Sequence, residues 1–380
     1  GEGVKRFARL IEALDRTTRT REKVAALEGY FREAPPEDAI WTLWVLAGRK
    51  QRRVLSGGDL RAWAAEFAEL PEWLVEESYA VVGDLAETLA LLVGSDGAGE
   101  GEPLHRVIEE DVLGLAALSP EEQRARVRSR WRDLSFWEAF VWHKLLTGAF
   151  RVGVGRGLVL RGLEGATGID RAVLTHRIAG SWEPTPETWA RIVGPEDERD
   201  DRARPYPFFL AHPLEDEPES LGGVDAWQVE WKWDGIRGQV IRRGDTVAIW
   251  SRGEELVTTT FPEVAEAAGA LPDGTVLDGE LVAIDTSSEG GIEGAPAVLP
   301  FSELQRRLNR SSVGAKLLRE VPVRFLAYDL LEDGGEDTRA RPTEDRRAAL
   351  DGLLNDGDPV VRGGIELAPL EHQGDDGLAE

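Results

Sequence analysis

Residues 230–237 read Glu-Trp-Lys-Trp-Asp-Gly-Ile-Arg, and this stretch decides how the second half of the chain is interpreted. If the run is extended, Lys232 and the carboxylates two residues away on either side point to one face. Trp231 and Trp233 then point the other way, into a core, and Gly235 allows a sharp turn. Lys232 is one of only six lysines in 380 residues, which favours a chemical role. The plainer alternative is a strand end with an ordinary Lys–Asp ion pair.

Outward from this stretch, short apolar or alternating runs are separated by Gly and Asp turns, a pattern typical of β-strands. These runs cover residues 227–231, 238–242, 246–251, 275–284 and 323–331. Helical spacing of apolar residues recurs at 261–270, 301–308 and 343–354. We therefore predict an α+β domain with antiparallel sheets over residues 205–380.

The first two hundred residues show helical periodicity instead. Apolar residues recur at helical spacing over residues 6–14, 24–31, 38–46, 59–70, 72–93 and 135–146, and Ser119 followed by Pro-Glu-Glu starts a further helix. Residues 194–204 lack apolar periodicity and read as a linker. The predicted fold class is multidomain, with an all-α domain over residues 1–204 followed by the α+β domain.

Composition excludes several classes of site. The chain has no cysteine, which rules out disulfides, a cysteine-ligated zinc site and a thiol nucleophile, and which fits a reducing cytoplasm. The most apolar stretch, residues 79–93, contains Asp84 and Glu87 and is shorter than the ~18 apolar residues that a membrane span needs. We expect no membrane association.

The net charge of −25 disfavours binding to nucleic acid, because phosphate contacts need cations. The first 204 residues carry 29 basic and 35 acidic side chains, however, and the rest carry 16 and 35. Most of the acidity therefore lies in the second half. Adaptation to high salt is an alternative explanation of the acidic composition.

The helical half has two local concentrations of basic residues. The candidates for phosphate contact are Arg49, Lys50, Arg52 and Arg53 in one run, and Arg151 in the Gly-rich turn at 147–155. Arginines also alternate from 124 to 132. The alternative for all of them is a solvated charged surface paired with neighbouring acids.

Four motifs recur in the order and spacing of the covalent nucleotidyltransferases. They are Lys232-x-Asp-Gly-x-Arg237, Ser251-Arg252-Gly253, Asp278-Gly279-Glu280-Leu281 and the run Phe325–Leu331, which contains Tyr328. Residues 205–211 and the helical half, including residues 145–154, are also similar to one group of these enzymes. On these residues the chain resembles the bacterial ATP-dependent DNA ligases over nearly its whole length.

The resemblance implies a mechanism and a site. Lys232 would attack the α-phosphate of ATP, and the AMP would pass to the 5′-phosphate of a nick before the 3′-hydroxyl displaces it. Glu230 would read the adenine, Arg237 and Arg252 would grip the ribose and phosphates, Glu280 would contact the ribose or a metal ion, and Tyr328 would stack on the base. The implied cofactors are ATP and Mg²⁺ or Mn²⁺. The implied partner is nicked duplex DNA, bound by a monomer in the cytoplasm (nucleoid), in repair, replication or recombination.

Two lysine-bearing motifs of the family have no counterpart, because the last lysine is Lys316. The chain also starts without methionine. We therefore expect an excerpted chain that holds the DNA-binding domain and an incomplete nucleotidyltransferase domain, and that does not seal nicks by itself.

Three other functions share part of this pattern. An RNA ligase or an mRNA-capping guanylyltransferase has the same lysine motif, but the large helical domain favours a DNA ligase. NAD-dependent ligases are disfavoured by the absence of cysteine. A catalytically inactive DNA-binding subunit is the alternative that is not an enzyme. The presence of Lys232, Arg252 and Glu280 argues against this alternative.

Overall fold

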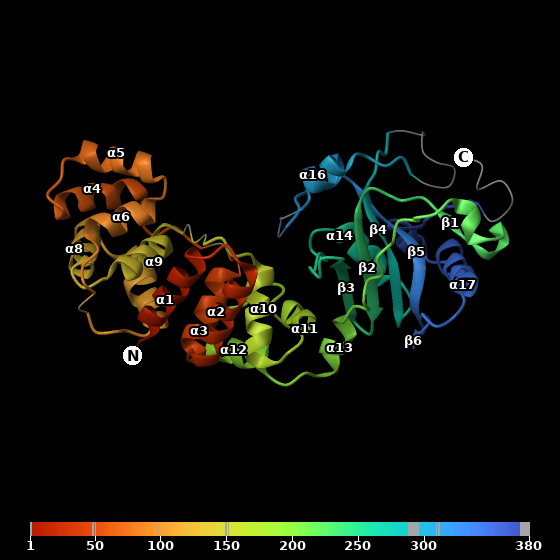
Figure 1. Ribbon diagram of the computed structural model, residues 1–380, viewed down its shortest axis with the longest axis horizontal. Coiled ribbons are helices and arrows are strands. Elements are labelled where there is room, and N and C mark those ends of the chain that lie inside the picture. The colour runs from red at the N-terminus through yellow and green to blue at the C-terminus, as the bar shows by residue number, and fades with distance from the viewer. Residues whose placement is uncertain are drawn as a thin grey trace. The chain divides into compact units, whose positions relative to one another are not determined.

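The computed structural model describes residues 2–372 apart from positions 48, 50, 98, 149, 151, 288–295, 309 and 311. The chain forms two compact units, Gly1–Pro195 and Glu196–Glu380 (Figure 1). The boundary between the units therefore precedes the one that we predicted after residue 204.

The first unit is built from helices around one apolar core. Its helices are α1 (Gly3–Asp15), α2 (Thr20–Glu33), α3 (Pro36–Leu46), α4 (Gly57–Phe67), α5 (Glu72–Val82), α6 (Leu85–Val93), α7 (Leu104–Arg106), α8 (Pro120–Trp131), α9 (Phe136–Thr147), α10 (Arg156–Thr167), α11 (Arg171–Arg177) and α12 (Pro186–Val193), with a π-helix at Val107–Val112 and a 3-10 helix at Leu113–Ala117. Ser119 and Ser135 begin α8 and α9 with complete capping boxes. Trp131 and Trp142 are among the largest side chains buried in the core.

The helix predicted over residues 72–93 is wrong, since the structure divides it into α5 and α6. Gly83 ends α5 in the left-handed conformation at φ 79°. Asp84 then starts α6, because its carboxylate accepts a hydrogen bond from the Glu87 N–H at 2.8 Å. The acidic residue that interrupts the apolar run is therefore a helix cap.

The segment predicted as a linker contains a short helix, α13 (Glu198–Ala203), which belongs to the second unit. Asp197 caps it through a capping box with Asp200. The Ala203 carbonyl accepts a hydrogen bond from the Trp250 indole N–H at 2.7 Å. Charged residues without apolar periodicity form a helix here because caps and one buried tryptophan hold it.

The second unit is an α+β domain, as predicted. Its main sheet contains β2 (Ile236–Arg243), β3 (Thr246–Ser251), β4 (Thr275–Ala283), β5 (Val323–Asp333), β6 (Glu336–Asp337) and β7 (Ile365–Leu367), in the order β3-β2-β4-β5-β6 with β7 also on β5. All pairings are antiparallel except that of β7 with β5. A second sheet pairs β1 (Val229–Glu230) with β8 (Leu370–His372).

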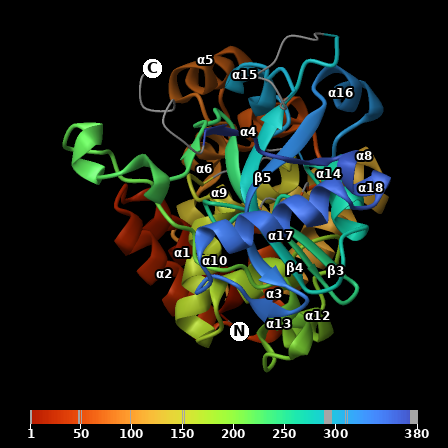
Figure 2. The same ribbon diagram turned by 90° about the vertical axis from the view of Figure 1, so that its right-hand side faces the viewer.

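One face of the main sheet packs on the apolar core of this unit. Val240, Leu277 and Phe325 from the sheet belong to one buried apolar cluster with Val264 of α14 (Pro262–Gly269) and Leu350 of α17 (Thr343–Asn355). Helix α17 lies across β5 (Figure 2). The remaining helices are α15 (Phe301–Gln305), α16 (Ala315–Glu320) and α18 (Pro359–Arg362), with 3-10 turns at Pro218–Leu221 and Val224–Ala226.

The opposite face of the sheet carries polar residues beside a smaller apolar cluster. Because side chains alternate along a strand, Arg237, Asp278 and Glu280 all point to this second face. The cluster next to them contains Leu326 and Trp233. The candidate site is therefore built on the face of the sheet that does not carry the main core.

Candidate active site

Lys232 lies in an irregular loop, residues 231–235, that joins β1 to β2. Its side chain is exposed, as is that of Asp234. Trp233 packs against the smaller apolar cluster as predicted. Trp231 was expected to face a core but is 41% exposed, because the chain is not a regular strand here.

The loop is held against β4 at Gly235. A Cβ at this position would lie 2.1 Å from the Leu281 carbonyl oxygen and 3.0 Å from Glu280 Cγ. The backbone N–H of Gly235 also donates a hydrogen bond to the Glu280 carboxylate. Glycine is therefore required by close backbone approach, whereas we had expected it to permit a sharp turn.

Arg237 is fixed by contacts on two sides. Its Nη2 donates to Asp278 Oδ2 at 2.8 Å and its Nε to Oδ1 at 3.4 Å, while Nη1 donates to the Phe209 carbonyl. Burial raises the pKa of the Asp278 carboxyl, and the ion pair with Arg237 opposes that rise. Asp278 was missing from the predicted site residues, although its spacing of two from Glu280 already placed both on one face.

Glu280 lies directly opposite Arg237 in the register of β4 and β2. Burial raises the pKa of its carboxyl to about 7, and the negative charges of Asp278 and Asp234 add to the rise. Gly235 and Arg237 lower the pKa by smaller amounts. Burial is therefore the main reason that the ionised form of Glu280 is disfavoured.

Tyr328 lies on the same face as Leu326, two residues before it in β5, as strand alternation requires. Asp278 pairs with Asp329 and the next residue, Gly279, pairs with Ala327, so Tyr328 is the extra residue of a β-bulge. The Arg237 guanidinium lies 5.7 Å from the centre of its ring. Burial raises the pKa of the Tyr328 hydroxyl far above its ordinary value, and the Asp278 carboxylate adds to this.

Glu230 and Arg252 complete the predicted set. Gln228 Nε2 donates to Glu230 Oε1 at 2.5 Å, and desolvation raises the pKa of the Glu230 carboxyl. The side chain of Arg252 is exposed, but its backbone N–H donates to the Arg237 carbonyl oxygen at 2.9 Å. The turn after β3 therefore lies beside Arg237.

The structure thus brings most of the predicted nucleotide site together. Arg237, Glu280 and Tyr328 share one face of the sheet with Asp278, and the charges of Glu230 and Glu280 both act on Tyr328. The exposed side chain of Lys232 lies on the loop between Glu230 and Gly235. Among the described residues, no group of three or more His, Asp or Glu side chains is arranged to hold a metal ion.

The basic residues of the helical unit differ in their environment. Arg49 donates to the carbonyls of Ile178 at 2.6 Å and Gly180 at 2.5 Å, and its guanidinium lies 4.8 Å from the Trp182 ring. The guanidinium of Arg49 is therefore engaged in contacts within the helical unit.

Arg52 and Arg53 are both exposed. Their segment packs against the last turn of α9, since the Val54 N–H donates to the Leu146 carbonyl oxygen at 2.9 Å. Lys50 and Arg151 lie outside the described residues.

The alternating arginines of α8 are paired with acids. Arg124 and Arg128 contact Glu66, while Arg126 and Arg130 contact Asp111. This is the alternative that the sequence left open for these positions, a charged helix surface neutralised by its neighbours.

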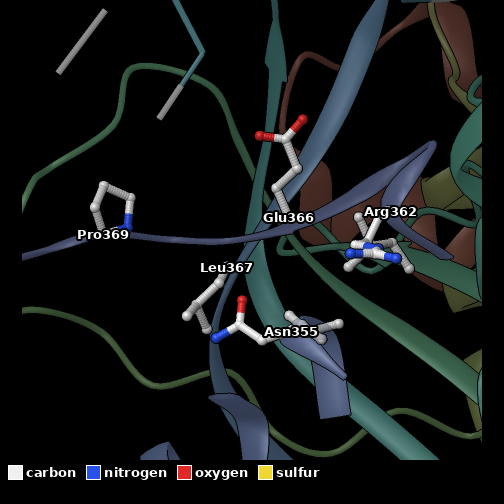
Figure 3. Close-up of a pocket in the computed structure, with 7 residues that line it drawn as sticks. Asn355, Arg362, Glu366, Leu367 and Pro369 are labelled. Atoms are coloured by element: carbon white, nitrogen blue, oxygen red, sulfur yellow. The ribbon is translucent and has the colours of Figure 1, made fainter. Parts of the chain in front are cut away.

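A pocket in the second unit lies beside the sheet between α17, α18 and β7 (Figure 3). It is lined by Leu354, Asn355, Arg362, Ile365, Glu366, Leu367 and Pro369. Glu366 is ion-paired with Arg324 at 3.4 Å. None of the predicted nucleotide-site residues lines this pocket, so it is a separate feature of the domain.

The antiparallel sheet, with its exposed lysine loop and the acidic and aromatic residues of the adjacent strands, has the architecture of a covalent nucleotidyltransferase domain. Residues 4–164 match the family model described as "DNA ligase N terminus", and residues 209–363 match "ATP dependent DNA ligase domain". The chain belongs to the ATP-dependent DNA ligase family.

Relatives and a solved structure are similar to this chain. A "Probable DNA ligase" of Koribacter versatilis is 30% identical over 370 residues, covering 93% of this chain and 61% of the relative. A "Probable DNA ligase" of an Anaeromyxobacter species is 30% identical over 365 residues, covering 94% and 64%. The crystallised ligase domain of M. tuberculosis LigD is 31% identical, covering 40% of this chain and 42% of that chain, with a TM-score of 0.30. The chain thus spans less than two thirds of the length of the two relatives.

No helix in the described ranges has both the length and the apolar character that a membrane crossing requires.

Proposed function

We propose that this chain performs nucleotide loading for the ATP-dependent sealing of nicks in duplex DNA. Lys232 Nζ, after losing its proton to solvent, attacks the α-phosphorus of ATP. A P–N bond forms, the bond from the α-phosphorus to the bridging oxygen breaks as pyrophosphate leaves with the electron pair, and the nitrogen releases a second proton to solvent. An oxygen of the 5′-phosphate at a nick then attacks the same phosphorus, and the P–N bond breaks as the lysine nitrogen leaves with the electron pair and takes up a proton.

The observation that carries this proposal is the way in which the lysine loop is held. Glu230 at one end pairs with Leu370, and Gly235 at the other end is pressed against β4. The exposed Lys232 between them is therefore presented to solvent from a loop with two fixed ends. Positioning of this kind supplies a large part of the rate of a group transfer.

The neighbouring residues suit the parts of a nucleotide. Tyr328 offers an aromatic ring for stacking on adenine, and the Glu230 carboxylate accepts a hydrogen bond from the exocyclic amine. Arg237 keeps two N–H groups beyond those that bind Asp278 and Phe209, and Arg252 is exposed. Both are suited to the ribose and phosphates.

The charge of the site fits a divalent cation. Burial raises the pKa of Glu280 to about 7, and Gly235 and Arg237 only partly offset that rise, so a bound cation would further stabilise the ionised form. Mg²⁺ or Mn²⁺ is commonly bound by one or two carboxylates together with substrate phosphates. Glu280 would hold it, and the ion would neutralise charge on the transferring group.

The DNA partner is assigned to the helical unit. Arg52 and Arg53 are exposed on a segment that packs against the C-terminal end of α9. The acidity of the chain is concentrated in the other unit, so this surface is less repulsive to phosphate than the net charge suggests. We propose that the chain binds nicked duplex DNA as a monomer in the cytoplasm.

The test follows the label from the nucleotide to DNA. The chain is incubated with Mg²⁺, α-labelled ATP and a nicked duplex, and separately with a nick that has a 5′-hydroxyl, a nicked RNA duplex, and labelled GTP. We expect labelled AMP on the 5′-phosphate of the DNA nick only. Lys232→Arg abolishes the label, and Lys316→Arg, which changes an exposed lysine, retains it.

Two results would contradict the proposal. One is labelling of the DNA nick by the Lys232→Arg variant. The other is a preference for GTP or RNA, which would identify a capping enzyme or an RNA ligase.

A further inference from the structure

Three polar side chains on one face of β2 bind the backbone of a single segment, residues 204–209, which we call the strap. Arg243 Nη1 donates to the Arg204 carbonyl at 2.7 Å, Gln239 binds Tyr206, and Arg237 donates to the Phe209 carbonyl. These three residues of β2 are spaced by even numbers, so all face the strap. The strap runs antiparallel to β2 and ends at the candidate site.

Gln239 makes the central contact. Its Nε2 donates to the Tyr206 carbonyl oxygen at 2.8 Å, and its Oε1 accepts from the Tyr206 N–H at 2.9 Å. The side chain is completely buried. A buried amide with both groups satisfied by one residue's backbone acts as a substitute for a strand partner, and replacing it would remove both of these hydrogen bonds from the Tyr206 backbone.

The sequence of the strap makes this contact specific. Pro205 and Pro207 have no backbone N–H, so Tyr206 offers the only N–H donor of the three residues. Proline at 207 also restricts Tyr206 to extended backbone.

The side chain of Tyr206 is anchored as well. Its hydroxyl donates to Glu332 Oε2 at 2.7 Å, and the Arg339 guanidinium lies 4.3 Å from the centre of its ring. Glu332 in turn binds Arg243 through both of its oxygens. Tyr206 is therefore a fixed point from which the strap reaches Phe209, three residues further on.

Phe209 contributes its carbonyl rather than its side chain, which is 71% exposed. That carbonyl and Asp278 take three of the five N–H groups of Arg237 and define the plane of the guanidinium. The direction of the two remaining N–H groups depends on where the strap places the carbonyl.

We infer that Gln239 is a positioning residue for AMP transfer, because it fixes the strap so that the Phe209 carbonyl orients Arg237 for the nucleotide. This inference rests on the proposed function, since its effect on rate is read through labelling of the chain. Its structural half, the attachment of the strap, can be measured independently.

The test is a double-mutant cycle between Gln239→Leu and Arg237→Lys, with the rate of AMP incorporation measured at saturating ATP. A misplacement of about 1 Å costs up to ~10²-fold in rate, and we expect Gln239→Leu to slow incorporation by about tenfold or more. In the Arg237→Lys background the same substitution should change the rate by less than about twofold, because the group through which Gln239 acts has already been replaced.

Two controls distinguish a general loss of stability from the positioning effect of Gln239. Thr338→Val removes another buried hydrogen bond of this unit, from Thr338 Oγ1 to the Leu330 carbonyl, and should lower stability without slowing incorporation. Hydrogen exchange should show that the Tyr206 amide is protected in the wild type and exchanges at least about tenfold faster in Gln239→Leu.

Several outcomes would overturn the inference. They are an equal slowing by Gln239→Leu in both backgrounds, a comparable slowing by Thr338→Val, or unchanged protection of the Tyr206 amide. If the wild-type chain incorporates no AMP while the amide behaves as expected, the proposed function fails and the attachment of the strap stands.

Discussion

Gly235 offers the sharpest perturbation of the site, because its role depends on a single measured contact. Replacing it with alanine would place a Cβ 2.1 Å from the Leu281 carbonyl oxygen. Carbon–oxygen contacts in proteins are about 3.3–3.6 Å, so the loop must retreat from β4 by about 1 Å. This movement would break the hydrogen bond from the Gly235 N–H to Glu280 and displace Lys232.

The expected magnitudes follow from that displacement. Misplacement of a reacting group by about 1 Å costs up to ~10²-fold in rate. Overpacking costs about 1–3 kcal/mol, and each kcal/mol lowers the melting temperature by about 2–4 °C in a domain of this size. We therefore expect Gly235→Ala to slow AMP incorporation by about 10²-fold and to lower the melting temperature by several degrees.

The assay is incorporation of labelled AMP at saturating ATP, together with thermal unfolding. Gly352→Ala is the matched control, because no atom lies within 4 Å of the added Cβ and alanine favours helix α17 by about 0.5–1 kcal/mol. This control should melt slightly higher and incorporate AMP at the wild-type rate. If Gly235→Ala kept the wild-type rate and stability, the close-contact explanation would be refuted.

Three further predictions concern charge. Burial raises the pKa of Glu280 to about 7 in the folded chain, so its ionisation should lower the free energy of unfolding as the pH rises from about 5 to 7. The free energy of unfolding of Glu280→Gln, measured by urea unfolding relative to wild type, should therefore be up to about 3 kcal/mol higher at pH 8 than at pH 5. An equal difference between the two proteins at both pH values would contradict this. Arg52→Ala should weaken DNA binding and reduce the salt slope by about one, whereas Arg49→Ala should mainly lower stability; equal salt slopes for Arg52→Ala and wild type would argue against a phosphate contact. Glu263→Ala should destabilise the second unit by about 3–5 kcal/mol, because it leaves the fully buried Arg307 without its carboxylate, and replacing both residues by apolar ones should cost less.

The sequence predicted the features that depend on local periodicity. The helical first unit and the antiparallel second unit are confirmed. Asp278 and Glu280 lie two residues apart in β4 and share a face, a regularity that we did not use when choosing site residues, and Arg237 lies opposite Glu280. The stacking ring was chosen by motif, and strand alternation places it on this face with Leu326; the β-bulge at Tyr328 is a feature that no sequence pattern revealed.

The errors arise where distant residues decide the outcome. From the sequence, Arg49 was a candidate for phosphate contact. In the structure, its guanidinium donates to the carbonyls of Ile178 and Gly180 and lies over the Trp182 ring. Trp231 reads as a core residue because regular alternation was assumed in a loop. Such contacts between residues far apart in sequence cannot be inferred from spacing alone.

The central claim is that Lys232 carries the nucleotide, and peptide mapping by mass spectrometry tests it most directly. The chain is incubated with ATP and Mg²⁺, digested, and searched for an added AMP. We predict one AMP per chain, on the peptide that contains Lys232, with an acid-labile bond typical of a phosphoramidate. AMP on any of the other five lysines, or on the Lys232→Arg variant, would contradict it.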